Sequence, residues 1–153
     1  SSNRFDVMGS VFDWIELPQS DIFYSGPRGC NGICAGGRLA DMLTFALAQI
    51  DQTTDFTKYD NNGSDNIPNS VDDDGFVDFV AFVHPEKGGE CAPRGMSDDI
   101  WSHRFSIQSL TGSNFTTNDR GQNGHNIVID DYVIMPALAC DGSTMIPIGV
   151  FAH

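Results

Sequence analysis

The residues best suited to chemistry form an acidic stretch in the middle of the chain. Residues 51–78 contain eight aspartates, and Lys58 is the only basic residue among them. Clustered carboxylates repel one another unless a cation lies between them. Their oxygens are also hard ligands of the kind that calcium prefers. The stretch therefore indicates a cation-binding loop.

Two short segments of this stretch match a calcium loop if residues 64–73 are treated as an insertion. Joined end to end, Asp60–Gly63 and Asp74–Asp78 read D-N-N-G-D-G-F-V-D, with oxygen side chains at positions one, three, five and nine. Gly75 then takes position six, where such a loop turns sharply. The pattern predicts that calcium is bound by four side chains and one main-chain carbonyl. These ligands are Asp60, Asn62, Asp74, Asp78 and the carbonyl of Phe76.

The remaining calcium ligands are left open by the pattern. Ala81 stands at position twelve, where an EF-hand has a glutamate, so the loop is not an EF-hand. Water, Asp65 or Asp72 could complete the coordination. The insertion has five Asp and Asn residues, among them Asp73, which are enough for a second ion. The competing interpretation is a solvated acidic loop held by Asx turns.

Other residues with catalytic potential form no recognisable motif. His84 and His103 could line a cleft or be structural, and their spacing matches no zinc motif. His125 lies in a Gly/Asn loop and is expected to be exposed. No serine has a G-x-S-x-G elbow, and a catalytic cysteine would compete with disulfide formation. We therefore discard a serine or cysteine nucleophile.

The four cysteines, at positions 30, 34, 91 and 140, indicate disulfides. They include no CxxC pair, and this dispersed spacing favours a secreted protein over a zinc knuckle. Three pairings are possible. We favour Cys30 with Cys34, which would close a tight turn, and Cys91 with Cys140, which would join two long loops. The other two pairings stay open.

Composition narrows the class of protein and its partners. The 153 residues are 40% hydrophobic, which suits one folded domain with a core. The net charge of -13 argues against nucleic acid and against an anionic membrane surface as partners. No apolar run approaches the roughly 20 residues of a membrane span.

A few helices and strands must position these loops. Apolar residues at steps of three and four predict an amphipathic helix over Leu39 to Ile50. The β-branched and aromatic run at 77–83 predicts a central strand that ends at His84. Further strands are expected over 5–17, 100–107 and 127–135, and a loop is expected over 111–126. The apolar residues 145–153 suggest a helix that has just begun, and hence a truncated domain.

Several of these segments together resemble one protein family. They are Arg4–Gly9, Tyr59–Gly63, Asp74–Asp78, Val83–His84, Asp99–Arg104, Asp131–Ile134 and Ile148–His153. In this order they are similar to the N-terminal half of the catalytic domain of secreted zinc metalloproteases related to immune inhibitor A. In that family the last segment continues into H-E-F-G-H. The resemblance therefore implies that His153 is a zinc ligand, the first histidine of an H-E-x-x-H helix.

The resemblance implies an extracellular zinc metalloendopeptidase, with calcium as a stabilising cofactor and a protein or peptide as substrate. In H-E-x-x-H, two histidines on one helix face bind zinc and the glutamate acts as general base. Only the first of these residues is present, so residues 1–153 alone are expected to be inactive and to need the remainder of their own polypeptide. The alternative is a non-catalytic calcium-binding extracellular module with a structural or adhesive role.

The implied fold is α+β, like the upper subdomain of a zincin or metzincin protease. It would have a twisted sheet with flanking helices and an active-site helix that starts near Ile148. Residues 1–153 would form the N-terminal part of a single catalytic domain. An edge strand of such a sheet pairs with the peptide substrate through main-chain hydrogen bonds. We expect residues 100–107 or 127–135 to form that edge.

Overall fold

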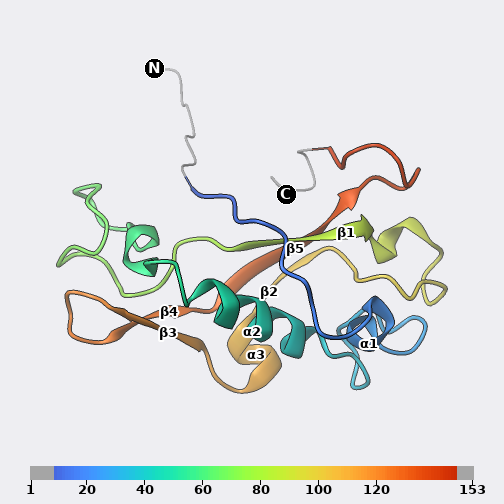
Figure 1. The fold of residues 1–153 in the computed structure, drawn as a ribbon, viewed down its shortest axis with the longest axis horizontal. Coiled ribbons are helices and arrows are strands. Elements are labelled where there is room, and N and C mark those ends of the chain that lie inside the picture. Colours follow the sequence, from blue (N-terminus) through green and yellow to red (C-terminus); the bar gives the residue numbers. More distant parts are fainter. Residues whose placement is uncertain (1–8, 148–153) are drawn as a thin grey trace.

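The computed structural model describes residues 9–147, which form two small sheets joined by one long helix (Figure 1). The first sheet has the order β1-β5-β2, with β1 at Ala81–Lys87, β5 at Asp131–Leu138 and β2 at His103–Ser106. β1 is parallel to the central β5, and β2 is antiparallel to it. The second sheet is an antiparallel hairpin of β3, Phe115–Arg120, and β4, Asn126–Ile129. The fold class is α+β, as expected.

Two of the α-helices precede the first strand, and the third joins β2 to β3. They are α1 at Asp21–Ser25, α2 at Leu39–Ile50 and α3 at Ile107–Thr111, with 3-10 turns η1 at Phe56–Tyr59 and η2 at Gly89–Cys91. The bounds of α2 are those predicted from the sequence. Leu39, Leu43 and Leu47 are almost completely buried because a spacing of four places them on one helix face. Burial of each leucine side chain contributes roughly 1.5–3 kcal/mol to the free energy of folding.

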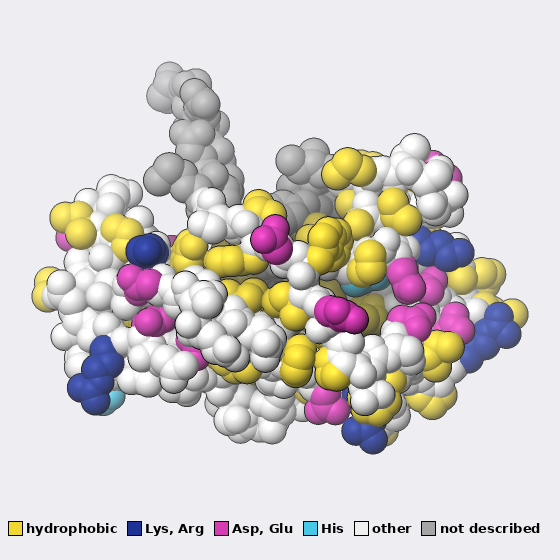
Figure 2. Space-filling model, viewed as in Figure 1, with side chains coloured by type: hydrophobic (Ala, Val, Ile, Leu, Met, Phe, Trp, Pro, Cys, Tyr) yellow, Lys and Arg dark blue, Asp and Glu magenta, His cyan; other side chains and the backbone are white. Residues whose placement is uncertain are grey.

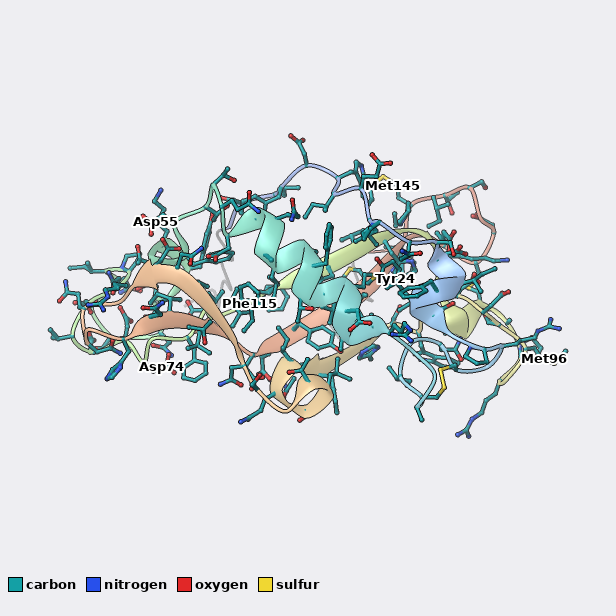
Figure 3. All side chains as sticks on the ribbon, turned by 60° about the horizontal axis from the view of Figure 1, so that its bottom comes forward. Tyr24, Asp55, Asp74, Met96, Phe115 and Met145 are labelled. Carbon is teal, nitrogen blue, oxygen red and sulfur yellow. A yellow bond between two sulfur atoms is a disulfide. The ribbon has the colours of Figure 1, made fainter. Side chains whose placement is uncertain are left out.

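One core joins α2 to both sheets. The buried side chains of α2 share it with Ile127 and Ile129 of β4 and with Tyr132 and Ile134 of β5. These strand residues alternate with more exposed ones, as expected when one face of a sheet is buried. Figure 3 shows α2 lying across the strands, with Asp55 and Asp74 at one end of the molecule and Tyr24 and Met96 at the other. The acidic stretch is therefore held at the end opposite α1.

The strand expected over residues 77–83 is found at Ala81–Lys87, as β1, and it is not the central strand of its sheet. β1 pairs only with β5, so it is an edge strand of the first sheet. The strand does not end at His84, and Pro85 lies inside it. An edge strand tolerates a residue without an N–H group, and the register with β5 becomes irregular after His84.

The strand expected over residues 127–135 is divided at Asp130. The main-chain carbonyl of Asp130 accepts a hydrogen bond from Ile107 N at 2.9 Å, and its carboxylate accepts one from Gln108 N at 2.8 Å. Asp130 thus satisfies the start of α3 instead of continuing the strand. Because β5 is central, this part of residues 127–135 has no free edge for a substrate.

The two expectations on either side of α3 are each partly wrong. A strand was expected over residues 100–107, but β2 covers only His103–Ser106. It ends there because α3 begins at Ile107. The loop expected over residues 111–126 contains β3. Thr117 of β3 is 1% exposed, and its hydroxyl donates to the Ile127 carbonyl at 2.9 Å. Pairing with β4 thus overrides a composition that is typical of loops.

The two ends of the described chain differ from expectation. Residues 9–17 form no strand, and Val11 and Trp14 are exposed. A β-forming composition needs a partner strand, and none within the described chain pairs with this segment. At the other end, Met145 pairs with Leu138 in an antiparallel bridge, so residues 145–147 are not helical. Residues 5–8 and the helix expected near Ile148 lie outside the described residues.

The cysteines pair as the sequence favoured. Disulfides join Cys30 to Cys34 and Cys91 to Cys140. The first closes the turn after α1. The second joins η2 to the segment that follows β5.

Candidate calcium loop and adjoining cavity

Asp60 lies at the centre of the acidic stretch and is 2% exposed. It follows η1, and its Oδ2 accepts a hydrogen bond from Gly75 N at 3.0 Å. Its Oδ1 is buried and has no hydrogen-bond partner among residues 9–147. Burial, followed by repulsion from Asp73 and Asp74, raises the pKa of Asp60 to about 6. A buried, unpaired carboxylate oxygen among other carboxylates is a position at which a cation would be stabilised.

The two segments expected to form the calcium loop lie side by side. Asn62 Oδ1 accepts a hydrogen bond from Asp74 N at 3.3 Å, and both carboxylate oxygens of Asp78 accept from Asn61 N. Gly75 joins them with a φ of +85°, a conformation that disfavours any residue with a side chain. Burial also raises the pKa of Asp78. The fold thus brings together Asp60, Asn62, Asp74 and Asp78, with residues 64–73 looping out.

Of the three aspartates in the insertion, Asp73 acts most directly on Asp60. Asp73 accepts hydrogen bonds from Gly63 N at 2.8 Å and from Ser70 N at 2.7 Å, and its charge acts on Asp60. Asp72 is exposed. The hydrogen bonds that it accepts lower its pKa, and the bond from the Ser70 hydroxyl has the largest effect. Asp65 is exposed and bonds only within its own turn. In the sequence, only the position of Asp73 next to Asp74 pointed to its proximity.

The oxygen donors suit calcium in type, but they do not converge on one point. Within residues 9–147, no three His, Cys, Asp or Glu side chains lie close enough together to hold a metal ion. Several of the carboxylates bind main-chain N–H groups instead. Asp74 Oδ1, for example, accepts from Phe76 N at 2.9 Å. The unpaired Oδ1 of Asp60 is the observation that fits a cation here.

His103 is a structural histidine. Its Nδ1 lies 2.6 Å from the Trp101 carbonyl, which can only accept, so Nδ1 donates. Its Nε2 lies 2.9 Å from the Tyr132 hydroxyl and therefore accepts a hydrogen bond from it. Burial lowers the pKa of His103, which keeps the ring neutral. His125 is exposed, as expected.

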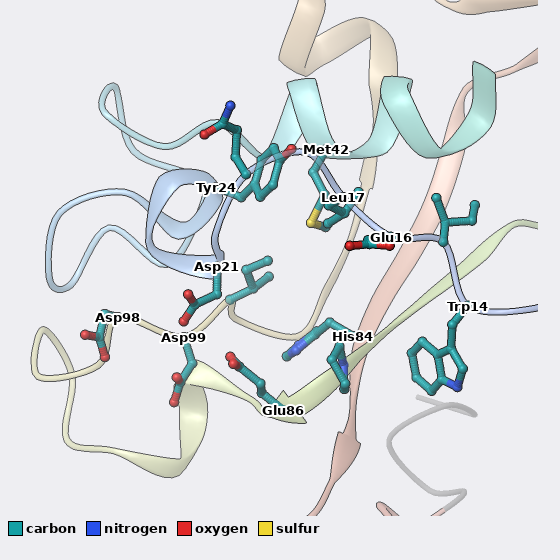
Figure 4. Close-up of a pocket in the computed structure, with 14 residues that line it drawn as sticks. Trp14, Glu16, Leu17, Asp21, Tyr24, Met42, His84, Glu86, Asp98 and Asp99 are labelled. Atoms are coloured by element: carbon teal, nitrogen blue, oxygen red, sulfur yellow. The ribbon is translucent and has the colours of Figure 1, made fainter. Parts of the chain in front are cut away.

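His84 faces a cavity of about 570 Å³ that motif analysis did not reveal. The N-terminal segment, α1, α2 and β1 all contribute to its lining (Figure 4). His84 is 8% exposed, and burial lowers its pKa. Its Nε2 has no hydrogen-bond partner in the part of the chain that the structure describes. The residues around this cavity are far apart in the sequence and follow no motif. Only the fold brings them together.

Comparison with known proteins places the chain in a family. A family model described as immune inhibitor A peptidase M6, catalytic domain, matches residues 1–153. The chain belongs to this peptidase family. Membership of the M6 peptidases confirms the resemblance seen in the sequence and supports a metallopeptidase as the parent protein. It does not favour a non-catalytic module. No curated protein matches the chain.

The zinc ligand implied for this M6 peptidase chain lies outside the described residues, because His153 belongs to residues 148–153. Residues 9–147 do not supply a zinc site of their own, since no three potential metal ligands lie close together there and both ring nitrogens of His103 are hydrogen-bonded. No helix in the described part of the chain is both long enough and apolar enough to cross a membrane.

Proposed function

We propose that this chain is the N-terminal part of the catalytic domain of a secreted, zinc-dependent metalloendopeptidase that cleaves proteins or peptides. The proposal rests on the family match over residues 1–153, together with the segment Ile148–His153, which resembles the start of the zinc-binding helix. The substrate class follows from the peptidase family. The two disulfides are compatible with an oxidising, extracellular location.

In this proposal His153 provides one of the zinc ligands. A zinc ion in such a site would supply Lewis-acid activation of the water that attacks the peptide bond. A catalytic zinc takes three protein ligands, so residues 1–153 alone cannot hold it tightly. The other ligands would come from the remainder of the polypeptide.

The described residues would contribute a surface for the substrate backbone. β2 is an edge of the first sheet, and within the described chain no strand pairs with its outer side. An extended peptide could add there as a further strand, since an edge strand presents unpaired main-chain groups. This supports residues 100–107, of the two segments expected, as the substrate edge.

The calcium loop would stabilise the end of the molecule opposite α1. Asp60, Asn62, Asp74, Asp78 and the Phe76 carbonyl remain the proposed ligands, and the position of Asp73 adds it in preference to Asp65 and Asp72. Calcium between these carboxylates would remove their mutual repulsion.

The test compares the 153-residue chain with a polypeptide that extends beyond His153. We expect the short chain to bind little zinc and to leave casein or a quenched peptide intact. The extended polypeptide should bind zinc, cleave, and lose both properties on chelation. His153→Ala should abolish zinc binding and cleavage in the extended polypeptide. His125→Ala, at an exposed histidine in the β3–β4 turn, is the matched control and should change neither.

Three outcomes would overturn the proposal. One is zinc-independent peptidase activity in purified residues 1–153. Another is an extended polypeptide that cleaves normally after His153→Ala. The third is a parent sequence that lacks Glu and His at the H-E-x-x-H spacing.

A further inference from the structure

The cavity beside His84 has apolar walls. Side chains of Trp14, Leu17, Tyr24, Met42 and Ile100 form most of them. Its volume of about 570 Å³ is in the range of small-ligand sites. Figure 2 shows acidic side chains beside a hollow with apolar ones at its floor, on the α1 side of this face. An apolar chain with a polar end would fit such a space.

The charged residues that line this cavity within the described part of the chain are acidic. Five carboxylates line it there, and no lysine or arginine of residues 9–147 does. They belong to Glu16, Asp21, Glu86, Asp98 and Asp99. Within residues 9–147, none of these side chains accepts a hydrogen bond or pairs with a cation. Like charges beside low-dielectric walls concentrate a negative potential in the cavity.

The carboxylates are close enough to affect one another but do not form a metal site. Burial raises the pKa of Glu86, and the charges of Asp21, Asp99 and Asp98 raise it further. Yet no three acidic or histidine side chains in the described chain converge as metal ligands. A charge spread around a rim suits an organic cation, which is larger than a metal ion and can contact several carboxylates.

A second observation points into the same cavity. His84 is more than nine-tenths buried, and no group of the described residues forms a hydrogen bond with its Nε2. Figure 4 shows its side chain between Glu86 and Trp14, among the residues that line the cavity. A buried polar atom without a partner is costly, and a ligand with polar groups could relieve that cost.

Neighbouring arginines are engaged elsewhere. Arg38 lies 3.4 Å from Asp41 and 4.9 Å from the centre of the Phe23 ring. Arg28 donates from Nε to the Met96 carbonyl at 2.8 Å. Neither lines the cavity, so neither neutralises its rim.

We propose that this cavity binds a lysine or arginine side chain of a peptide, with the methylene stem along the apolar walls and the charged head among the carboxylates. Lysine and arginine combine these two properties in one side chain. That the peptide is a substrate rests on the proposed function. Binding itself requires no hydrolysis.

The test is a titration of the 153-residue chain, and of the polypeptide extended beyond His153, with acetyl-arginine methylamide. Acetyl-citrulline methylamide is the neutral isostere. We expect the arginine compound to bind about tenfold more tightly or better, because only it forms charge-assisted hydrogen bonds. Calorimetry gives the affinities, and NMR shifts at Trp14 and His84 locate the ligand.

Substitution of single carboxylates tests whether the acidic residues of the cavity bind the arginine compound. Glu86→Gln should weaken binding of the arginine compound about fivefold, as expected for loss of one partly exposed charge pair. Asp13→Asn removes the same charge from an exposed residue that does not line the cavity, so it should leave the affinity unchanged. Melting temperatures would show that both variants fold.

Several results would contradict the proposal. Equal binding of the arginine and citrulline compounds excludes recognition of charge. Equal effects of Glu86→Gln and Asp13→Asn exclude this cavity. Tighter binding of free agmatine or cadaverine than of the peptide compounds excludes a peptide as the source of the cation. In the extended polypeptide, binding of basic peptides without any cleavage contradicts the proposed function but supports the cavity.

Discussion

Burial determines the charge of His103, because its effect on the pKa outweighs the hydrogen bond to the Trp101 carbonyl, which favours the protonated ring. Its ring lies against Tyr132, and its two nitrogens bond in opposite senses, one donating to Trp101 and one accepting from Tyr132. Protonation would turn Nε2 from an acceptor into a donor, so the Tyr132 hydroxyl could no longer donate to it. The neutral form is therefore the folded form, which agrees with the lowered pKa.

The lowered pKa of His103 predicts that the free energy of unfolding decreases as the pH falls. Because the pKa of His103 is lower in the folded state than its ordinary 6.5, the unfolded chain takes up a proton first as pH falls. The contribution of His103 is complete above pH 6.5 and is lost below it. The slope is at most about 1.4 kcal/mol per pH unit. Urea unfolding at pH 7.5 and 5.5 should show a larger loss for the wild-type chain than for His103→Gln.

The control for the His103→Gln variant is the same substitution at an exposed histidine. His125→Gln should behave like the wild type, because His125 is exposed in the β3–β4 turn. His84 and the aspartates of the acidic stretch also titrate, but they are present in every variant and cancel in the difference. A loss that is the same in wild type and His103→Gln would show that His103 is not held neutral by the fold.

Among the structural elements, the acidic stretch is a loop in which Asp60 and Asp78 accept hydrogen bonds from Gly75 N and Asn61 N and so hold its two segments together. Chelation should therefore loosen residues 60–78 and lower the melting temperature. Calcium at a hundred times its dissociation constant stabilises by about 2.7 kcal/mol. For a chain of this size that corresponds to a rise of about 5–10 °C. Differential scanning calorimetry with millimolar calcium and with excess chelator measures the difference.

Variants separate the proposed ligands from their neighbours. Asp74→Ala should abolish the calcium-dependent rise in melting temperature, and Asp73→Asn should reduce it. Asp65→Asn is the control, because Asp65 is exposed and bonds only to Ile67 N in its own turn. Equal melting temperatures with calcium and with chelator would leave only the interpretation as a solvated acidic loop.

At the scale of the whole molecule, the two disulfides should contribute unequally to stability. Cys91 and Cys140 are 49 residues apart and join η2 to the end of β5, whereas Cys30 and Cys34 are only 4 apart. Loop-closure entropy predicts a loss of roughly 4 kcal/mol on replacing the long-range pair by serines, and roughly 2 kcal/mol for the short-range pair. Chemical denaturation of the two double variants measures both losses.

The order of these losses is the decisive result. A larger loss for the Cys30–Cys34 pair would show that native contacts, and not loop closure, dominate. Peptide mapping without reduction checks the pairing itself. A peptide that links Cys30 or Cys34 to Cys91 or Cys140 would contradict it.

Features that depend on local residue spacing were predictable before the fold was known. The period of Leu39, Leu43 and Leu47 predicted α2, because a helix with one buried face needs only its own residues to show the pattern. The aspartates of the acidic stretch likewise indicated that Asp60 and Asp74 would meet. The resemblance that carried the family assignment also lies in short segments of the sequence.

The pairing of the strands, and the contacts between residues far apart in the sequence, could be seen only in the folded structure. Residues 77–83 and 127–135 both have β-forming compositions, but composition does not say that β5 is central and β1 an edge. Strand order depends on long-range hydrogen bonds, which leave no local signal. For the same reason the cavity was not predicted. Trp14, His84 and Asp99 come from three distant segments that the packing of α1, α2 and β1 brings together.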